Sequence, residues 1–232
     1  MKTCRCLIFS AAFLLLLLFQ TAAAAVDGAP GAAEESDVQF RWAFAAMTNQ
    51  DDKSIRPITQ DIALQSGDQM KMMVELQRRC FVYIFHYNPQ DGLKLVFPYT
   101  LQQFGTDYQP TRKYYIPRGD GWFKLDGTPG KEVFYLVASA KRLDSLEQAY
   151  QRHESAAALQ KPEAARAVLD QIRTLRKEHI ELSAPAERPV PIGGAVRGVE
   201  KVEDPSQFDI SALAKDIIST DFMARTFTIE HK

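Results

Sequence analysis

The strongest constraint on the fold of this chain is a series of short apolar segments, each ended by turn residues. Residues 38–46 and 70–76 alternate apolar with mainly polar side chains, which is the period of a half-buried strand. Residues 81–85 are apolar on both faces and rich in aromatic residues, as in a central strand. Further strands are expected at 93–97, 113–116, 122–125 and 133–139. Many short strands with turns between them indicate a β-sandwich or a barrel-like domain.

The period of the apolar residues changes after residue 140. Leu143, Leu146 and Tyr150 recur at the three- and four-residue spacing of an amphipathic helix, and the same spacing continues from Ala165 to Leu175. Pro162 stands where a proline is tolerated, in the first turn of a helix. We therefore expect two helices, at roughly 141–160 and 162–182, packed as an antiparallel pair.

The C-terminal part begins with three prolines between residues 184 and 191, which are typical of a stiff connector. A short amphipathic helix is expected next, with Ile210, Leu213, Ala214 and Ile217 on one side. Residues 223–231 alternate again and predict a strand that returns to the sheet, since an isolated terminal strand would bury nothing. The fold class is therefore α+β, mainly β, with a helical pair inserted into one β-rich domain.

The N-terminus has the organisation of a secretory signal peptide. Lys2 and Arg5 precede an apolar run at 7–19, and small residues at Ala23 and Ala25 suit a signal peptidase. We expect cleavage after Ala25, export to the periplasm or the extracellular space, and no stable membrane span afterwards. An uncleaved membrane anchor is the alternative, because residues 7–25 carry no charge and nearly reach the length of a span.

Charge and cysteine content narrow the function classes. Loss of Lys2 and Arg5 with the signal peptide changes the formal net charge from −1 to −3. A chain with this mildly negative charge lacks the excess of basic residues that is typical of nucleic-acid-binding proteins. Cys80 would be the one remaining cysteine and cannot form an intramolecular disulfide.

The expected organisation is signal peptide 1–25, flexible leader 26–37, β-rich domain 38–140, helical insertion 141–182, Pro/Gly connector 183–204, and a short helix with the final strand at 205–232.

No motif indicates a catalytic centre, a metal site or a cofactor. The four histidines do not occur in metal-binding spacings, and the Ser66-Gly67-Asp68 sequence is typical of a turn. Cys80 opens the most apolar strand, so a small buried residue is favoured over a nucleophile. A pair of carboxylates from separate loops, as in glycoside cleavage, stays open as an alternative. Its candidates are Asp107, Asp120, Asp126 and Glu132.

Aromatic residues are concentrated between positions 97 and 122, in a stretch rich in Asp, Gln and Gly. Most of them would suit a hydrophobic core. The alternative is a recognition patch, because tyrosine and tryptophan offer apolar area together with a polar group. The candidate binding residues are Tyr99, Phe104, Tyr108, Tyr115 and Trp122.

The order of several strand and turn motifs resembles the domain-of-unknown-function family 4384. The motifs are Ser66-Gly67-Asp68, Cys80-Phe81-Val82-Tyr83, Gly92 before Leu95-Val96-Phe97-Pro98, Tyr115-Ile116-Pro117, Trp122-Phe123, and Gly130-Lys131-Glu132 before Phe134-Tyr135-Leu136-Val137-Ala138-Ser139. They cover roughly residues 40–140. The resemblance implies a small β-rich module of bacterial envelope proteins, in some cases fused to caspase-like peptidase or kinase domains. It implies no established activity and no catalytic residues.

These observations favour a non-catalytic interaction module of the bacterial envelope, with an envelope protein or a glycan as its partner. A hydrolase that acts on an envelope polymer through loop carboxylates is the alternative. The partner, the substrate and the oligomeric state do not follow from the sequence.

Overall fold

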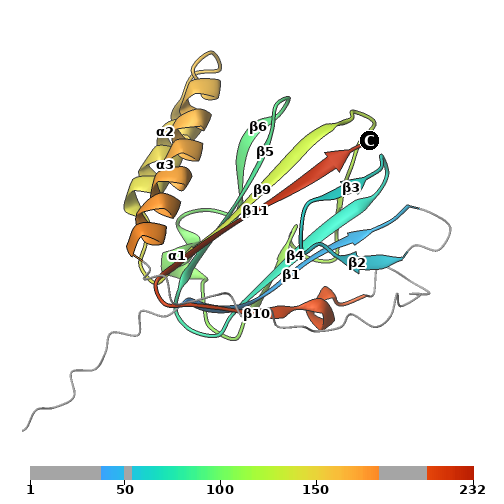
Figure 1. Ribbon diagram of the computed structural model, residues 1–232, viewed down its shortest axis with the longest axis horizontal. Helices are drawn as coiled ribbons and strands as arrows, with labels where there is room; N and C mark the ends of the chain where they lie inside the picture. The colour runs from blue at the N-terminus through green and yellow to red at the C-terminus, as the bar shows by residue number, and fades with distance from the viewer. Residues whose placement is uncertain (1–37, 50–53, 183–207) are drawn as a thin grey trace, which may run out of the picture. The chain divides into compact units, whose positions relative to one another are not determined.

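Two β-sheets stacked face to face form the centre of the described structure (Figure 1). The computed structural model describes residues 38–49, 54–182 and 208–232, all of which belong to one unit of the chain. The predicted signal peptide, leader and connector lie outside the described residues. No helix in the described part of the chain is long and apolar enough to cross a membrane.

Sheet A has the strand order β10-β1-β4-β7, and two short strands are added to it, β2 on β1 and β8 on β4. Every pair in this sheet is antiparallel. The central pair forms because Phe40, Trp42 and Phe44 of β1 alternate with residues of the opposite face, and their partners in β4 alternate in the same way. The strands are β1 (Val38–Met47), β2 (Ile55–Pro57), β4 (Gln69–Leu76), β7 (Lys113–Ile116), β8 (Phe123–Lys124) and β10 (Lys215–Ser219).

Sheet B has the order β3-β11-β9-β5-β6. The final strand β11 pairs with β9 along its whole length and also holds the short parallel strand β3. The prediction that the last strand returns to the sheet is therefore confirmed. The strands are β3 (Ile62–Leu64), β5 (Phe81–Asn88), β6 (Gly92–Phe97), β9 (Gly130–Ser139) and β11 (Phe222–His231).

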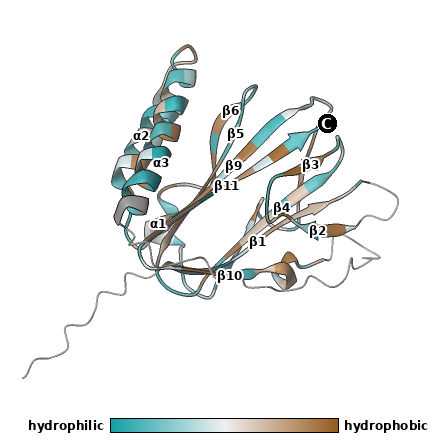
Figure 2. Ribbon diagram, viewed as in Figure 1, coloured by the Kyte–Doolittle hydropathy of each residue, from teal (hydrophilic) through white to brown (hydrophobic). Residues whose placement is uncertain are grey.

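The main core lies between the sheets and follows the alternation of the strands. Val82 and Ile84 of β5 point inward with Phe134 of β9 and Phe227 of β11, whereas Tyr83 belongs to the opposite face. Hydrophobic and hydrophilic residues accordingly form bands along β9 and β11 (Figure 2). Aromatic rings from both sheets meet edge to face, and the ring centroids of Phe44 and Phe134 are 5.2 Å apart.

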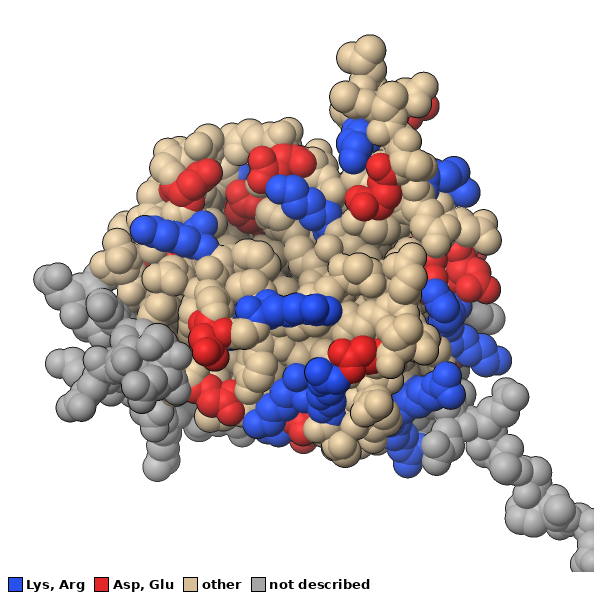
Figure 3. Space-filling model, turned by 180° about the vertical axis from the view of Figure 1, so that it is seen from behind, with Lys and Arg blue, Asp and Glu red and all other residues tan. Residues whose placement is uncertain are grey.

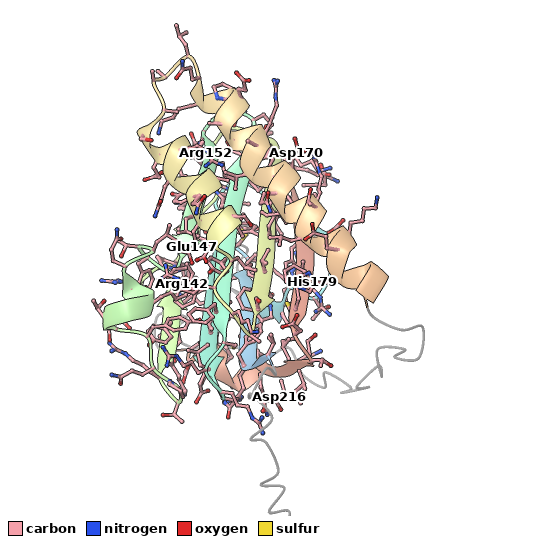
Figure 4. All side chains as sticks on the ribbon, turned by 90° about the vertical axis from the view of Figure 1, so that its left-hand side faces the viewer. Arg142, Glu147, Arg152, Asp170, His179 and Asp216 are labelled. Atoms are coloured by element: carbon pink, nitrogen blue, oxygen red, sulfur yellow. The ribbon has the colours of Figure 1, made fainter. Side chains whose placement is uncertain are left out.

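Helices α2 (Asp144–Ser155) and α3 (Lys161–Leu182) cover the outer face of sheet B. Leu146 and Val168 are completely buried there, in a second apolar cluster that also contains Tyr83 and Phe85 of β5. Figure 4 shows both helices lying across these strands. The predicted helical pair is thus present. Helix α2 is shorter than the predicted 141–160, because residues 156–160 connect the two helices, whereas α3 agrees with the predicted 162–182 to within one residue.

The expected α+β, mainly β fold is confirmed, and of the two expected architectures the sandwich is present, since the described sheets do not close into a barrel. The short helix α1 (Gln103–Thr106) is not among the predicted elements, and its Phe104 is buried. The expected helix through Ile217 is only a 3₁₀ turn at Ile210–Leu213, because Ile217 pairs with Phe40 as part of β10.

Candidate ligand-binding site

Polar side chains interrupt the apolar inner face of sheet B at one end of the sandwich. His86 and Asn88 occupy alternate positions of β5, on the same face of the strand as the core residues Val82 and Ile84. In the same way, Glu132 lies on the inward-facing side of β9 with Phe134, and His231 lies on the inward-facing side of β11 with Ile229. Three neighbouring strands therefore place two imidazoles, a carboxamide and a carboxylate where an apolar core would otherwise continue.

The carboxylate of Glu132 is the centre of this polar group. His86 Nε2 is hydrogen-bonded to Glu132 Oε2, and the Nδ2 group of Asn88 donates to the same carboxylate at 3.1 and 3.3 Å. The ring of His86 stacks on Phe134 with 4.7 Å between the centroids. Because Glu132 is only 8% exposed, these contacts replace most of its hydration.

The polar group opens into a recess of about 240 Å³ between the ends of the two sheets. Its apolar floor comes from Met70, Leu125 and Phe134, and Phe123 of β8 lies at its side. The other lining residues are polar or charged, apart from Val96: His86, Asn88, Gln90, Asp91, Lys94, Lys124, Asp126, Glu132 and His231. In Figure 1 this is the end of the sandwich marked by the C-terminus. The recess thus offers hydrogen-bond donors and acceptors above an apolar floor, as ligand pockets do.

The recess contains a histidine–carboxylate pair, His86 and Glu132. Such a pair activates a serine, threonine or cysteine in many hydrolases. None of these residue types is among the described residues that line the recess, but the Ser66 hydroxyl is hydrogen-bonded to Nε2 of the lining residue His231 at 3.0 Å. The described residues also contain no group of three or more His, Cys, Asp or Glu side chains placed to hold a metal ion. Cys80 lies elsewhere in the core, and burial raises the pKa of its thiol to about 11.

The predicted carboxylate candidates are separated by the fold. Asp126 and Glu132 line the recess. Asp107 forms an ion pair with Arg112 outside the recess, and Asp120 follows Gly119 in an exposed turn. Only two of the four candidates are therefore brought to one site.

The predicted aromatic binding residues are distributed over three places. Phe104 and Tyr108 pack against each other with centroids 4.8 Å apart, and Tyr108 touches both main apolar clusters. The Tyr108 hydroxyl accepts a hydrogen bond of 2.9 Å from the backbone N–H of Val82. These two residues thus connect the sheets to the helical layer, and their role in binding stays a prediction.

Tyr115 and Trp122 lie on the outer face of sheet A, on either side of the buried Lys71. The Lys71 ammonium is 5.3 Å from the ring centroid of Tyr115 and 5.8 Å from that of Trp122, and it donates a 2.8 Å hydrogen bond to the Gly119 carbonyl. Burial lowers the pKa of Lys71. This aromatic slot is thus occupied by a side chain of the protein itself.

Tyr99 is half-buried in a separate groove beside α2, and its hydroxyl donates 2.6 Å to the Tyr115 carbonyl. Arg118 covers its ring at 3.9 Å from the centroid. No one surface therefore unites the five predicted aromatic residues.

The strands that build most of the recess lie in a single recognisable segment. Residues 63–142 match the family model of DUF4384, a domain of unknown function. The expected family is thereby confirmed for this segment. The DUF4384 segment contains His86, Asn88 and Glu132, whereas His231, β1 and the helical pair lie outside it. No curated protein and no solved structure matches the chain.

The sequence prediction did not identify His86, Asn88 or His231 as site residues. One signal was present in the sequence, since His86 and Asn88 continue the alternate positions of Val82 and Ile84 with polar side chains. Their meeting with Glu132 depends on the pairing of β5 with β9, in which His86 lies opposite Phe134.

The surface seen from behind in Figure 3 carries Lys and Arg side chains interspersed with Asp and Glu. This mixture agrees with the formal net charge of −1 for the whole chain. On that face, recognition would therefore depend on local contacts more than on a broad electrostatic field.

Proposed function

We propose that the chain is a non-catalytic binding module of the bacterial envelope, and that its recess holds one polar unit of an envelope glycan. The observation that supports this most directly is the polar group formed by His86, Asn88 and Glu132 on the inner face of sheet B. A buried carboxylate with a neighbouring amide and imidazole suits a ligand rich in hydroxyl groups, because each hydroxyl both donates and accepts.

The size of the recess sets the extent of the contact. Its volume of about 240 Å³ is below the roughly 300–1,000 Å³ of pockets that enclose a whole drug-sized ligand. The recess therefore suits a single sugar unit at the end of a longer chain, with Phe123 beside the ring and Lys94 and Lys124 at the rim. A free sugar would gain little affinity from so small a contact.

Binding can be tested with purified cell-wall muropeptides and short oligosaccharides by isothermal titration calorimetry. Glu132→Gln should weaken binding by about 10- to 100-fold, because a hydrogen bond to a charged group contributes roughly 1.5–3 kcal/mol. Glu230→Gln is the matched control, since Glu230 is an exposed carboxylate on β11 near Lys131. Equal affinity of the wild type and Glu132→Gln for every glycan that binds would show that the recess is not the site.

Export is part of this proposal and is supported by the charged, apolar and small-residue segments of residues 1–25. Cell fractionation and N-terminal sequencing of the mature protein test it. We expect an extracytoplasmic protein that begins at Val26, and a cytoplasmic protein that begins at Met1 would contradict it.

Hydrolysis of an envelope polymer is a second candidate, because Asp126 and Glu132 line the same recess. Incubation of the full chain with purified cell-wall polymer tests this alternative. Release of reducing ends that is lost in Asp126→Asn and Glu132→Gln would favour the hydrolase over the binding module.

A further inference from the structure

A second groove lies on the other side of β6. In the described part of sheet B, β6 is an edge strand and pairs only with β5. The groove has a volume of about 470 Å³, within the usual range of ligand pockets. One wall is Leu95 of β6 with Tyr99 and Leu101 after it, and the other is the C-terminal part of α2 with Tyr150, Gln151 and Glu154.

A side chain occupies the hydrogen-bonding position that a further strand would use. The backbone N–H of Leu95, next to a register shift in the β5–β6 pair, donates 3.2 Å to the hydroxyl of Tyr150 on α2. The same hydroxyl donates 2.8 Å to Glu154 Oε1. Tyr150 thus supplies the oxygen that a peptide carbonyl supplies when an extended segment adds to a sheet edge.

The walls of the groove define the chemistry of its occupant. Leu95, Leu101 and the ring of Tyr150 provide apolar surface, and Gln151 provides an exposed amide. Glu154 is the one charged side chain among the described residues that line it. Glu154 also lies in the last turn of α2, where the partial negative charge of the helix C-terminus favours a cation.

We propose that the groove between β6 and α2 binds an extended polypeptide segment that carries a lysine or arginine. A backbone carbonyl of this segment replaces the Tyr150 hydroxyl at the Leu95 N–H and extends sheet B by one strand. An apolar side chain lies against Leu95 and Leu101, and the basic side chain pairs with Glu154. This inference is independent of the glycan recess, which lies on the inner face of the sheet and is lined by Lys94 and Val96.

Selection of a random library of short linear peptides against the full chain tests the proposal. We expect enrichment of peptides that combine apolar residues with a lysine or arginine. The amide resonance of Leu95 should shift when a selected peptide is added to isotope-labelled protein. A library that yields no such peptides, or peptides that leave the Leu95 amide unchanged, would overturn the proposal.

Two variants separate the contributions of charge and of the edge position. Glu154→Gln should weaken binding of a selected peptide by about two- to fivefold, as expected for an exposed ion pair. Tyr150→Phe should strengthen binding, because the peptide carbonyl no longer competes with the hydroxyl for the Leu95 N–H. Glu163→Gln, an exposed acid on α3, is the matched control and should leave the affinity unchanged.

The two sites can be distinguished in the same experiment. Peptide binding that is lost in Glu132→Gln and unchanged in Glu154→Gln and Tyr150→Phe would place the peptide in the recess and overturn the groove proposal. Glycan binding should be unchanged in Glu154→Gln and Tyr150→Phe, so a failure of one proposal leaves the other measurable.

Discussion

The Tyr83 hydroxyl on β5 donates a 2.6 Å hydrogen bond to Glu147 Oε1 on α2, inside the layer between sheet B and the helices. The same hydroxyl accepts a 3.2 Å bond from the backbone N–H of Leu143, and Arg142 binds the Glu147 carboxylate from the other side. Figure 4 shows Arg142 and Glu147 next to each other. The start of α2 is thus connected to the centre of the sheet through one buried polar network.

Tyr83→Phe should destabilise the protein by about 1–3 kcal/mol, because it leaves the Leu143 N–H without its acceptor and removes one of the donors to the buried Glu147 carboxylate. Urea denaturation followed by circular dichroism measures this free energy. Tyr87→Phe, on the same strand but only half-buried, is the control and should change stability by less than about 0.5 kcal/mol. A loss of equal size in both variants would contradict a specific role for the network.

Acidification below pH 6.5 should weaken the helical pair through His153. This residue is 4% exposed, and its Nδ1 has no hydrogen-bond partner among the described residues. Burial, and then the charge of Lys161, lower its pKa from the ordinary 6.5, while Glu154 acts in the opposite direction. The unfolded chain therefore takes up the proton first, so stability is complete above pH 6.5 and falls as the pH drops through that value.

The contribution of His153 can be isolated with His153→Leu, which removes an unpartnered polar atom from a buried position. We expect equal or higher stability at pH 7 and a smaller loss of stability between pH 7 and pH 5 than in the wild type. An unchanged pH dependence in this variant would assign the effect to other groups.

A second pH effect is expected at Asp209, which caps the 3₁₀ helix by accepting a 2.8 Å hydrogen bond from the Ser211 N–H. Burial would raise its pKa, but hydrogen bonds from Ser211 and Tyr115 and the charge of Lys113 lower it to about 2. A lowered pKa stabilises the fold above the ordinary value of 3.8, and this stabilisation is lost as the pH falls towards 2. Trp122 fluorescence across this interval should change in the wild type and change less in Asp209→Asn.

Substitution of Tyr108 and Trp122 by alanine should have unequal effects. Tyr108 touches both main clusters and binds the Val82 N–H, so Tyr108→Ala should cost about 3–5 kcal/mol. Trp122 is half-buried at the edge of the small outer cluster, and Trp122→Ala should cost about 1 kcal/mol. Thermal unfolding compares the two, and equal costs would contradict the different packing of these residues.

The strand pattern was predictable because burial alternates with the pleat. Val38, Phe40 and Trp42 face the core as their spacing indicates, and the two helices follow their apolar stripes. Shorter elements could not be predicted in this way. β2 and β3 each contain too few residues to show a period, and β10 has helical spacing that is overridden by its pairing with β1.

The candidate site was predictable only in part. Glu132 was a candidate because a carboxylate can act from a loop, yet the structure places it in β9. Its contacts with His86 and Asn88 arise from the register of two strands that are distant in sequence. Such a register depends on how the whole sheet assembles, and no local pattern encodes it.

The position of β11 beside β9 has a consequence for the integrity of the chain. Ser139 pairs with Phe222, and among the described strands β3 pairs only with β11. Proteolysis that removes the final strand would therefore expose the long edge of β9 and release β3 at the same time. An exposed strand edge is a template for pairing with other chains, so a truncated form should aggregate.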